Sequence, residues 1–301
     1  MKQKTETGVS DPLAADVARQ YGRRQLAQTI LNTLADIGIT PDRLRPDDLA
    51  PFEELHIGGR EATRYLVARL DLGPDHQVLD VGCGIGGAAR YMASRAGCRV
   101  TGIDITPAFI QAAVTLTAAV GLDDKVRFEV GSALSLPYED DRFDALVTLH
   151  AAMNIVDRPL LYREMARVLK PGGKLALYDV MRQRQGGLRF PLPWADTPDI
   201  SHLLTPEQTR ALLQEAGLAV LEVEDRRAIA PEFFRRVLSD DPGEAVAATP
   251  RATLADGDVK LRNTLAGIED GLIAPVLMVA KKPPRARPPE GAAGPARGAE
   301  K

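Results

Sequence analysis

Cysteine, histidine and tryptophan are scarce in this sequence, and each shortage excludes a class of protein. The 301 residues include two cysteines, Cys83 and Cys98, four histidines and one tryptophan. Two cysteines are too few for the disulfide framework of a small secreted fold, and they fit a reducing compartment. Because no cysteines and histidines stand at the spacing of metal ligands, we expect no metal site.

Long apolar runs and an excess of one charge are also missing. No stretch approaches the roughly 20 apolar residues that a membrane-spanning helix needs. The net charge of −3 gives no reason to expect nucleic acid or an anionic membrane as a partner. The N-terminal stretch 1–13 lacks the apolar core of a signal peptide. We therefore expect a cytoplasmic protein with no membrane span and no nucleic-acid partner.

What the sequence does contain, from residue 77 onwards, is an alternation of short apolar strands with helices. Such alternation indicates crossover units and a largely parallel sheet with helices on both faces. The expected strands are 77–81, 99–105, 125–130, 143–150, 174–180, 218–225 and 272–282, and the expected helices are 86–97, 107–121, 158–170 and 205–217.

Other segments stand outside this alternation. Helices are expected at 14–38, where Leu26, Ile30, Leu31 and Leu34 share one face, and at 60–70, with a Pro- and Asp-rich break at 40–51 between them. The stretch 182–204 is a long loop with three prolines and Trp194, and loops of this length are usually functional or disordered. The proline-rich tail 283–301 has no core-forming residues and is expected to be disordered.

The sequence VLDVGCGIGG at 78–87 places Gly82, Gly84 and Gly87 at the spacing G-x-G-x-x-G, after a strand and before a helix. Asp104 follows about 20 residues later, where a carboxylate can accept hydrogen bonds from ribose hydroxyls. These features indicate an adenosine-containing cofactor without distinguishing NAD from others.

Asp80 separates the two cofactor classes. An ionised carboxylate about 4 Å from a pyrophosphate is repelled by about 1–4 kcal/mol, depending on the dielectric. The same charge attracts the sulfonium and ammonium of S-adenosylmethionine. Asp80 therefore favours S-adenosylmethionine, although a carboxylate that only binds the amides of its own loop is the alternative. An NAD(P)-linked oxidoreductase remains the second hypothesis.

Four stretches together resemble the motif series of class I S-adenosylmethionine-dependent methyltransferases. They are VLDVGCGIGG, VTGIDIT, GSALSLPYEDDRFDAL and VLKPGGKLALYDV, and the resemblance covers about residues 55–280. ELHIGGREAT, HAAMNI and FPLPWA resemble the small-molecule branch, with its sarcosine and dimethylglycine N-methyltransferases and its quinone and tocopherol C-methyltransferases. The resemblance implies an α/β, Rossmann-like fold with a seven-stranded, mostly parallel sheet. Its implied order is 3-2-1-4-5-7-6, with only the last strand antiparallel.

The chain is expected to divide into three parts. An N-terminal helical lid is expected at 1–60, and an S-adenosylmethionine-binding domain at 61–282 carries the substrate loop 182–204. The tail 283–301 follows.

Carried over onto this sequence, the family pattern assigns the cofactor site. Asp104 is expected to hold the ribose and Ile105 to pack on the adenine. Ser132 stands where the family usually has an acidic residue, so side-chain recognition of the adenine amino group is in doubt, while the Ala133 amide can still donate. The residues expected at the cofactor are Tyr21, Asp80, Gly82, Cys83, Gly84, Asp104, Ile105, Ser132, Ala133 and His150.

Methyl transfer from a sulfonium is an in-line displacement, so a pocket is needed first and a general base second. His150, at the end of the fourth strand, and His56, in LHIGG, are the candidate catalytic bases. A base of this kind predicts an acid limb of kcat near the usual pKa of histidine. The alternatives are that His150 only binds the cofactor and that His56 only caps the following helix.

Aromatic rings attract a desolvated cation by up to about 2 kcal/mol, so Tyr21 and Trp194 are expected in the roof, with plain packing as the alternative. Asn154 and Trp194 are the candidate acceptor-binding residues. The acceptor site is expected to be built from 14–60, 150–155 and 182–204.

We therefore interpret the chain as a methyltransferase that uses S-adenosylmethionine to methylate a small molecule, at nitrogen. The alternatives are O- or C-methylation of a phenolic, quinol or prenyl-type acceptor, the oxidoreductase, and a binding protein that has lost catalysis. The sequence does not name the acceptor, and it is compatible with a homodimer.

Overall fold

The structure of the protein is a computed structural model that describes residues 26–241 and 254–285. Tyr21, the first part of the expected helix 14–38, and most of the tail 283–301 lie outside the described residues.

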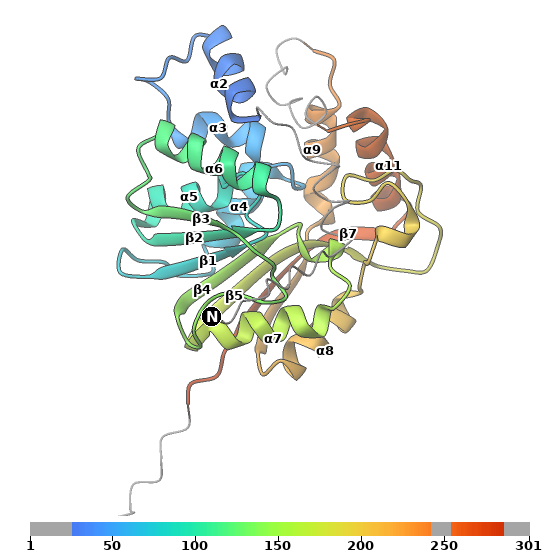
Figure 1. The fold of residues 1–301 in the computed structure, drawn as a ribbon. Coiled ribbons are helices and arrows are strands. Elements are labelled where there is room, and N and C mark those ends of the chain that lie inside the picture. The colour runs from blue at the N-terminus through green and yellow to red at the C-terminus, as the bar shows by residue number, and fades with distance from the viewer. Residues whose placement is uncertain (1–25, 242–253, 286–301) are drawn as a thin grey trace, which may run out of the picture.

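Seven strands form one sheet in the order β3-β2-β1-β4-β5-β7-β6 (Figure 1). β7 is antiparallel to both β5 and β6, and the remaining neighbours are parallel. The strands are β1 (Gln77–Val81), β2 (Arg99–Asp104), β3 (Val126–Val130), β4 (Phe143–Leu149), β5 (Leu169–Arg182), β6 (Ala219–Asp225) and β7 (Ile273–Lys281). The expected fold class, the strand order and the antiparallel last strand are confirmed.

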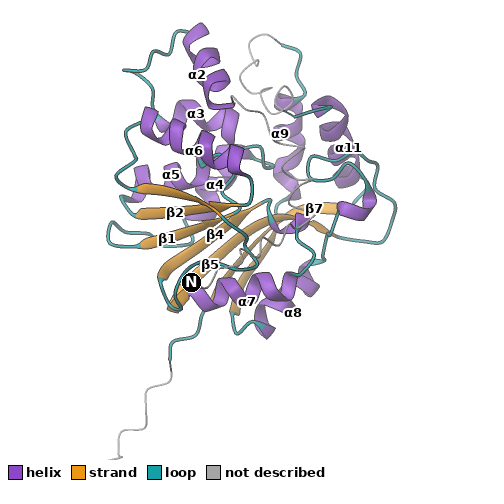
Figure 2. Ribbon diagram, in the orientation of Figure 1, coloured by secondary structure: helices purple, strands orange, loops and turns teal. Residues whose placement is uncertain are grey.

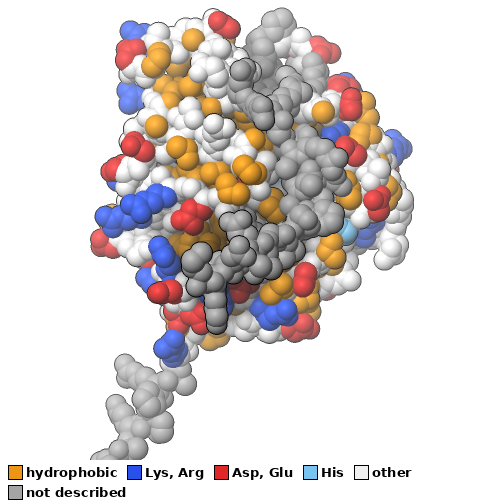
Figure 3. Space-filling view, viewed as in Figure 1, with side chains coloured by type: hydrophobic (Ala, Val, Ile, Leu, Met, Phe, Trp, Pro, Cys, Tyr) orange, Lys and Arg blue, Asp and Glu red, His pale blue; other side chains and the backbone are white. Residues whose placement is uncertain are grey.

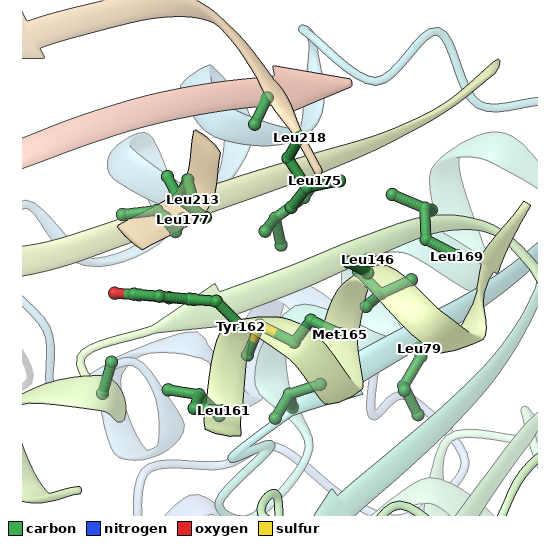
Figure 4. Close-up of a cluster of buried hydrophobic side chains, with 14 of the residues drawn as sticks. Leu79, Leu146, Leu161, Tyr162, Met165, Leu169, Leu175, Leu177, Leu213 and Leu218 are labelled. Carbon is green, nitrogen blue, oxygen red and sulfur yellow. The ribbon is translucent and has the colours of Figure 1, made fainter. Parts of the chain in front are cut away.

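Helices cover both faces of the sheet (Figure 2). One layer contains α4 (Gly59–Val67), α5 (Gly87–Ala96) and α6 (Pro107–Ala119), and the other contains α7 (Arg158–Val168) and α8 (Pro206–Glu215). The central strands are therefore apolar on both faces, as in β4, where Ala145, Leu146 and Val147 are all buried. Figure 4 shows the layer under α7, where Tyr162 and Met165 pack against leucines of β1, β4, β5 and α8.

A third layer lies over α5 and α6. It contains α2 (Leu26–Asp36) and α3 (Pro46–Glu53), whose side chains Ile30, Leu34 and Leu49 share an apolar cluster with Leu116 of α6. The break expected at 40–51 is present between the two helices, but it ends at residue 45, and the expectation is wrong for the part that forms α3. Pro46 occupies the first turn, where its missing N–H costs nothing, and the Asp48 carboxylate accepts a hydrogen bond from the Arg45 amide at 2.7 Å.

Two further helices, α9 (Ala230–Val237) and α11 (Gly257–Glu269), were not recognised in the sequence. They pack together with the loop 182–204 in a separate apolar cluster. That loop contains only short elements, a bridge between Leu192 and Ala195 and the 3-10 turn Pro198–Ile200. The other 3-10 turns are Ala152–Asn154 and Arg227–Ile229.

On the face shown in Figure 3, lysines, arginines and carboxylates of both signs are mixed around the periphery. Hydrophobic side chains gather near its middle, around α6. Within the described ranges, no helix has the length and apolar character that crossing a membrane requires.

Candidate functional site

A cavity of about 800 Å³ opens beyond the carboxyl ends of β1, β2, β3 and β4. Its volume lies in the range of small-molecule sites, and its place is where open parallel sheets bind ligands. The segments that line it come from 52–57, 80–88, 103–109, 131–134, 149–157, 193–194, 233–234 and 254–264, with Leu26 and Val180.

The glycine loop after β1 is held in place by its neighbour strand. The amides of Gly82 and Cys83 both donate to the carbonyl of Ile103, at 2.8 and 3.1 Å. Gly82 has a φ of +74°, and a Cβ there would lie 2.4 Å from the Cβ of Ala151. Glycine is therefore required at 82, because it lets the loop after β4, which carries His150, close onto the loop after β1.

Asp104, at the end of β2, is engaged by two backbone amides. Gly84 donates to its Oδ2 at 3.0 Å and Thr106 to its Oδ1 at 2.9 Å. A carboxylate accepts about four hydrogen bonds, so these two amides fix its orientation and leave capacity for hydroxyl groups. A Cβ on Gly84 would meet nothing within 4 Å, so glycine there keeps cavity space open.

Asp80 lies beneath the glycine loop and is 1% exposed. Within the described chain, its Oδ2 has no hydrogen-bond partner. Burial, and then the charge of Asp104, raise the pKa of Asp80 to about 7. The site thus holds a buried carboxyl group that a cation would return to its ionised form.

Ile105, Ser132 and Ala133 line the same end of the cavity. The Ser132 hydroxyl accepts a hydrogen bond from the Leu134 amide at 3.2 Å, which closes a local turn. Ser132 can still donate its proton to a ligand. The loops after β1, β2 and β3 therefore bring together every candidate cofactor residue except Tyr21, which lies outside the described residues, and His150.

His150 follows β4 in a strained conformation. Its φ is +49°, although it is not glycine, and its amide donates to the Tyr178 carbonyl at 2.7 Å. Its ring stacks on that of Tyr178 at 5.3 Å, and the ring of His56 lies 5.8 Å from it, edge to face. Left-handed backbone at a non-glycine residue costs of order 1–3 kcal/mol and is concentrated at functional sites.

The two histidines form an uncharged pair, in which His56 is buried and His150 is half-buried. Burial lowers the pKa of His56 to about 4, and burial together with His56 lowers the pKa of His150 well below its usual value. His56 Nε2 lies 3.0 Å from both the Gly59 carbonyl and the Thr63 hydroxyl, and these two contacts fix the orientation of its ring. Within the described chain, His150 Nε2 has no hydrogen-bond partner. An acid limb near the usual histidine pKa is therefore not expected.

Asn154 and Trp194 both line the cavity and contact each other. Asn154 Nδ2 donates to the Trp194 carbonyl at 3.0 Å, and Trp194 Nε1 donates to Ser201 Oγ at 3.0 Å. Trp194 is also buried in the cluster with α9 and α11. The loop 182–204 thus forms a wall of the cavity and is hydrogen-bonded to the loop after β4. The side-chain amide of Asn154 makes this contact with the loop 182–204.

A buried ion-pair network beside the glycine loop was missed in the sequence. Arg90 and Glu53 form an ion pair with both side chains fully buried, and Arg60 lies 3.4 Å from Glu53 and 3.2 Å from Glu54. Burial raises the pKa of Glu54 to about 8, against the opposing charge of Arg60. Nothing in the local sequence signals this network, because its members lie on three different helices.

The wall made by α9 and α11 was also missed. It contributes Phe233 and Phe234 from α9, and Lys260, Leu261 and Thr264 from α11. The apolar spacing of 261, 265 and 268 could have indicated a helix. Its position against the cavity has no signal in the sequence.

Among the residues the structure describes, no three His, Cys, Asp or Glu side chains are grouped as metal ligands. Burial raises the pKa of Cys83 well above its usual value, so this thiol in the glycine loop stays protonated.

Known proteins of similar sequence include methyltransferases. Residues 79–177 match the family described as a methyltransferase domain. The chain is 32% identical to methyltransferase GfsG of Streptomyces halstedii over 231 residues, which cover 73% of this chain and 79% of that protein. It is 31% identical to the glycine/sarcosine/dimethylglycine N-methyltransferase of Actinopolyspora halophila over 62% of this chain, which spans only 33% of that protein.

Among solved structures, that of the [4+2]-cyclase SpnF superposes with a TM-score of 0.65 at 25% identity. The superposition covers 91% of this chain and 98% of the cyclase. The fold therefore extends to a protein named for a different reaction.

Proposed function

This chain belongs to the S-adenosylmethionine-dependent methyltransferases, and we propose that it methylates a hydroxyl group of a neutral, largely apolar small molecule. The observation that carries the choice of acceptor is the uncharged pair His56 and His150, in a cavity whose described acceptor end has no carboxylate without a cation or a backbone amide beside it. Methylation at nitrogen, which the sequence predicts, is the alternative.

The cofactor end of the cavity fits S-adenosylmethionine. Asp80 offers a buried, unpartnered carboxyl oxygen to a cation, Asp104 keeps acceptor capacity for ribose, and Gly84 leaves space beside the loop. When bound, the cofactor supplies an electrophilic methyl group whose sulfur departs uncharged. We assign the loops after β1, β2 and β3 to this cofactor, and residues 26–57, as part of the proposed lid 1–60, to the cover of the site.

The charges at the acceptor end disfavour an ammonium acceptor. A buried cation needs a counter-charge, and each carboxyl group that lines the described wall outside the cofactor end already has a cation or a backbone amide beside it. Glu53 pairs with Arg90, Glu54 lies against Arg60, and Asp157 accepts from the Leu160 amide at the start of α7. An uncharged hydroxyl enters this wall without a counter-charge.

The histidine pair supplies what a hydroxyl acceptor needs. A hydroxyl oxygen becomes a good nucleophile as its proton is removed, and positioned bases contribute about 10²–10⁴-fold. At neutral pH both imidazoles are unprotonated, so His150 can take the proton directly. We assign the base to His150 and the support of its ring to His56 and Tyr178.

Isotope-labelled product identifies the methylated atom. The protein is incubated with carbon-labelled S-adenosylmethionine and a metabolite extract, and the labelled product is analysed by mass and carbon NMR. We expect the new methyl carbon to be bonded to oxygen. A methyl group on nitrogen would show that the acceptor is an amine and that the hydroxyl proposal is wrong. Cofactor binding without any methyl transfer would favour a binding protein or a reaction of another class.

Cofactor affinity is expected to depend on pH through Asp80. The pKa of Asp80 is raised to about 7 in the free protein, and a bound cation favours its ionised form. Binding therefore releases a proton, so affinity for S-adenosylmethionine falls by up to about tenfold per pH unit below pH 7. Titration calorimetry in buffers of different ionisation enthalpy measures the released proton.

Asp80→Asn is the matched variant and should remove this dependence. Asp179→Asn is the control, because burial also raises the pKa of Asp179, to about 6, but this residue does not line the cavity. Burial raises the pKa of Glu54 to about 8, above this range. A change of cofactor affinity with pH between about pH 6 and 7 is therefore assigned to Asp80. If the affinity for S-adenosylmethionine does not change with pH over that interval, Asp80 does not contact the cation of the cofactor.

A further inference from the structure

Lys260 is a buried cation in the wall of the cavity. It lies on α11 with 2% of its side chain exposed, and its Nζ lies 2.9 Å from Asp196 Oδ1. The Asp196 side chain, in the loop 182–204, is 53% exposed. The wall around Lys260 is apolar and includes Leu254, Leu261 and Phe234.

Such a pair contributes little to the stability of the fold. Desolvation of an ammonium costs several kcal/mol, and the attraction of a half-exposed carboxylate is weakened by water. An apolar side chain of similar length would fit this wall without that cost. A buried lysine that faces a ligand cavity therefore indicates a binding role.

The position of Lys260 assigns it to the acceptor. α11 lies across the molecule from α5 and the glycine loop (Figure 1). Thr264, one turn further along α11, also lines the cavity and donates its hydroxyl to the Lys260 carbonyl at 2.8 Å. Asn263 donates to the Pro191 carbonyl at 3.0 Å, which fixes the loop of Asp196 against the helix.

We propose that Lys260, which lines the cavity, forms with its ion-pair partner Asp196, which is not among the lining residues, a second subsite that holds an uncharged carbonyl oxygen of the acceptor away from the methylated group. The proposal rests on the proposed function and deepens it by naming a second group in the substrate. A lysine ammonium has three N–H donors, so its ion pair with Asp196 leaves donors for a ligand oxygen.

Asp196 sets the charge that this subsite accepts. Its carboxylate offsets the charge of the Lys260 ammonium, and a carbonyl oxygen adds no charge to the apolar wall. A carboxylate would add a negative charge next to Asp196, and an ammonium would add a positive charge next to Lys260. The subsite therefore selects an uncharged acceptor over both an anionic acceptor and a cationic one.

Three probes with one alkyl chain test this selection, namely octanamide, octanoate and octylammonium. The protein is first saturated with S-adenosylhomocysteine, so that the probes report on the rest of the cavity. Trp194 is the only tryptophan and lines the cavity, so its fluorescence follows binding, and calorimetry gives a second measurement. We expect octanamide to bind about tenfold more tightly than either charged probe.

The variants separate the two members of the pair. Lys260→Met should weaken the binding of octanamide by about tenfold. Asp196→Asn should invert the preference, so that octanoate binds more tightly than octanamide. Asp71→Asn is the control, because Asp71 is ion-paired with Lys174 outside the cavity. Unchanged affinity for S-adenosylhomocysteine verifies that each variant is folded.

An unchanged preference in Asp196→Asn overturns the proposal, as does the absence of probe binding or of discrimination in the wild type. Asp196→Asn keeps the test decisive if Lys260→Met does not fold, since Asp196 is half exposed. No methyl group is transferred in these titrations, so their outcome is independent of whether oxygen or nitrogen is methylated.

Discussion

His150→Gln is expected to lower kcat by about 10²–10⁴-fold, the usual contribution of a positioned base, while the affinity for S-adenosylhomocysteine stays within about twofold of wild type. Glutamine keeps a polar side chain of similar size but cannot take a proton at neutral pH. Steady-state kinetics and calorimetry measure the two quantities separately. A variant that binds the cofactor more weakly but keeps its kcat would show that His150 only contacts the cofactor.

The pH profile distinguishes a base from a merely structural histidine. The pKa of His150 is lowered well below its usual value by burial and by His56. A base must be unprotonated, so kcat should stay constant as the pH falls through the usual histidine range and decrease only at more acidic pH. A limb near the usual histidine pKa would contradict a buried base.

His202→Gln is the control for His150. His202 also has a buried Nε2 without a partner in the described chain, but it does not line the cavity. Its substitution is expected to leave kcat and the pH profile unchanged. Equal losses in the two variants would indicate a general effect of removing a buried imidazole.

Arg90→Met is expected to lower the free energy of unfolding by about 3–5 kcal/mol, because it leaves the buried Glu53 carboxylate without its main partner. Arg90 also donates to the Ile85 carbonyl in the glycine loop at 2.6 Å and to Thr117 Oγ1 in α6 at 2.7 Å. It thus joins α3, α5, α6 and the glycine loop at one point. Chemical denaturation monitored by circular dichroism measures the change.

Arg64→Met is the matched control. Arg64 is ion-paired with Glu61 on the surface of α4, with side chains 66% and 72% exposed. Exposed pairs contribute about 0–1 kcal/mol, so this variant should differ little from wild type. The double variant Arg90→Met with Glu53→Gln should recover part of the loss, because the stranded charge is removed. Equal stability of Arg90→Met and Arg64→Met would exclude the network as a structural centre.

The sheet could be predicted because its signals are local. Val78 and Leu79 precede the glycine loop, and similar apolar runs recur between helices of matching length, so strands and crossovers follow from neighbouring residues. The place of Asp104 at the end of β2 followed in the same way, since the carboxyl end of a parallel strand points to the ligand edge. The break expected at 40–51 extends too far because proline and aspartate suit the start of a helix as well as a loop, and Pro46 occupies the first turn of α3.

By itself, the sequence determined the strands of the sheet with the helices that connect them, the glycine loop with Asp80 and Asp104, and the two histidines as candidates. Only the tertiary structure decided that His56 and His150 meet, that burial keeps both uncharged, and that α9 and α11 form the far wall with Lys260 opposite Asp196. The reason is physical. Strand and turn formation depend on residues a few positions apart, whereas pKa values and ion pairs depend on burial and on contacts between distant segments.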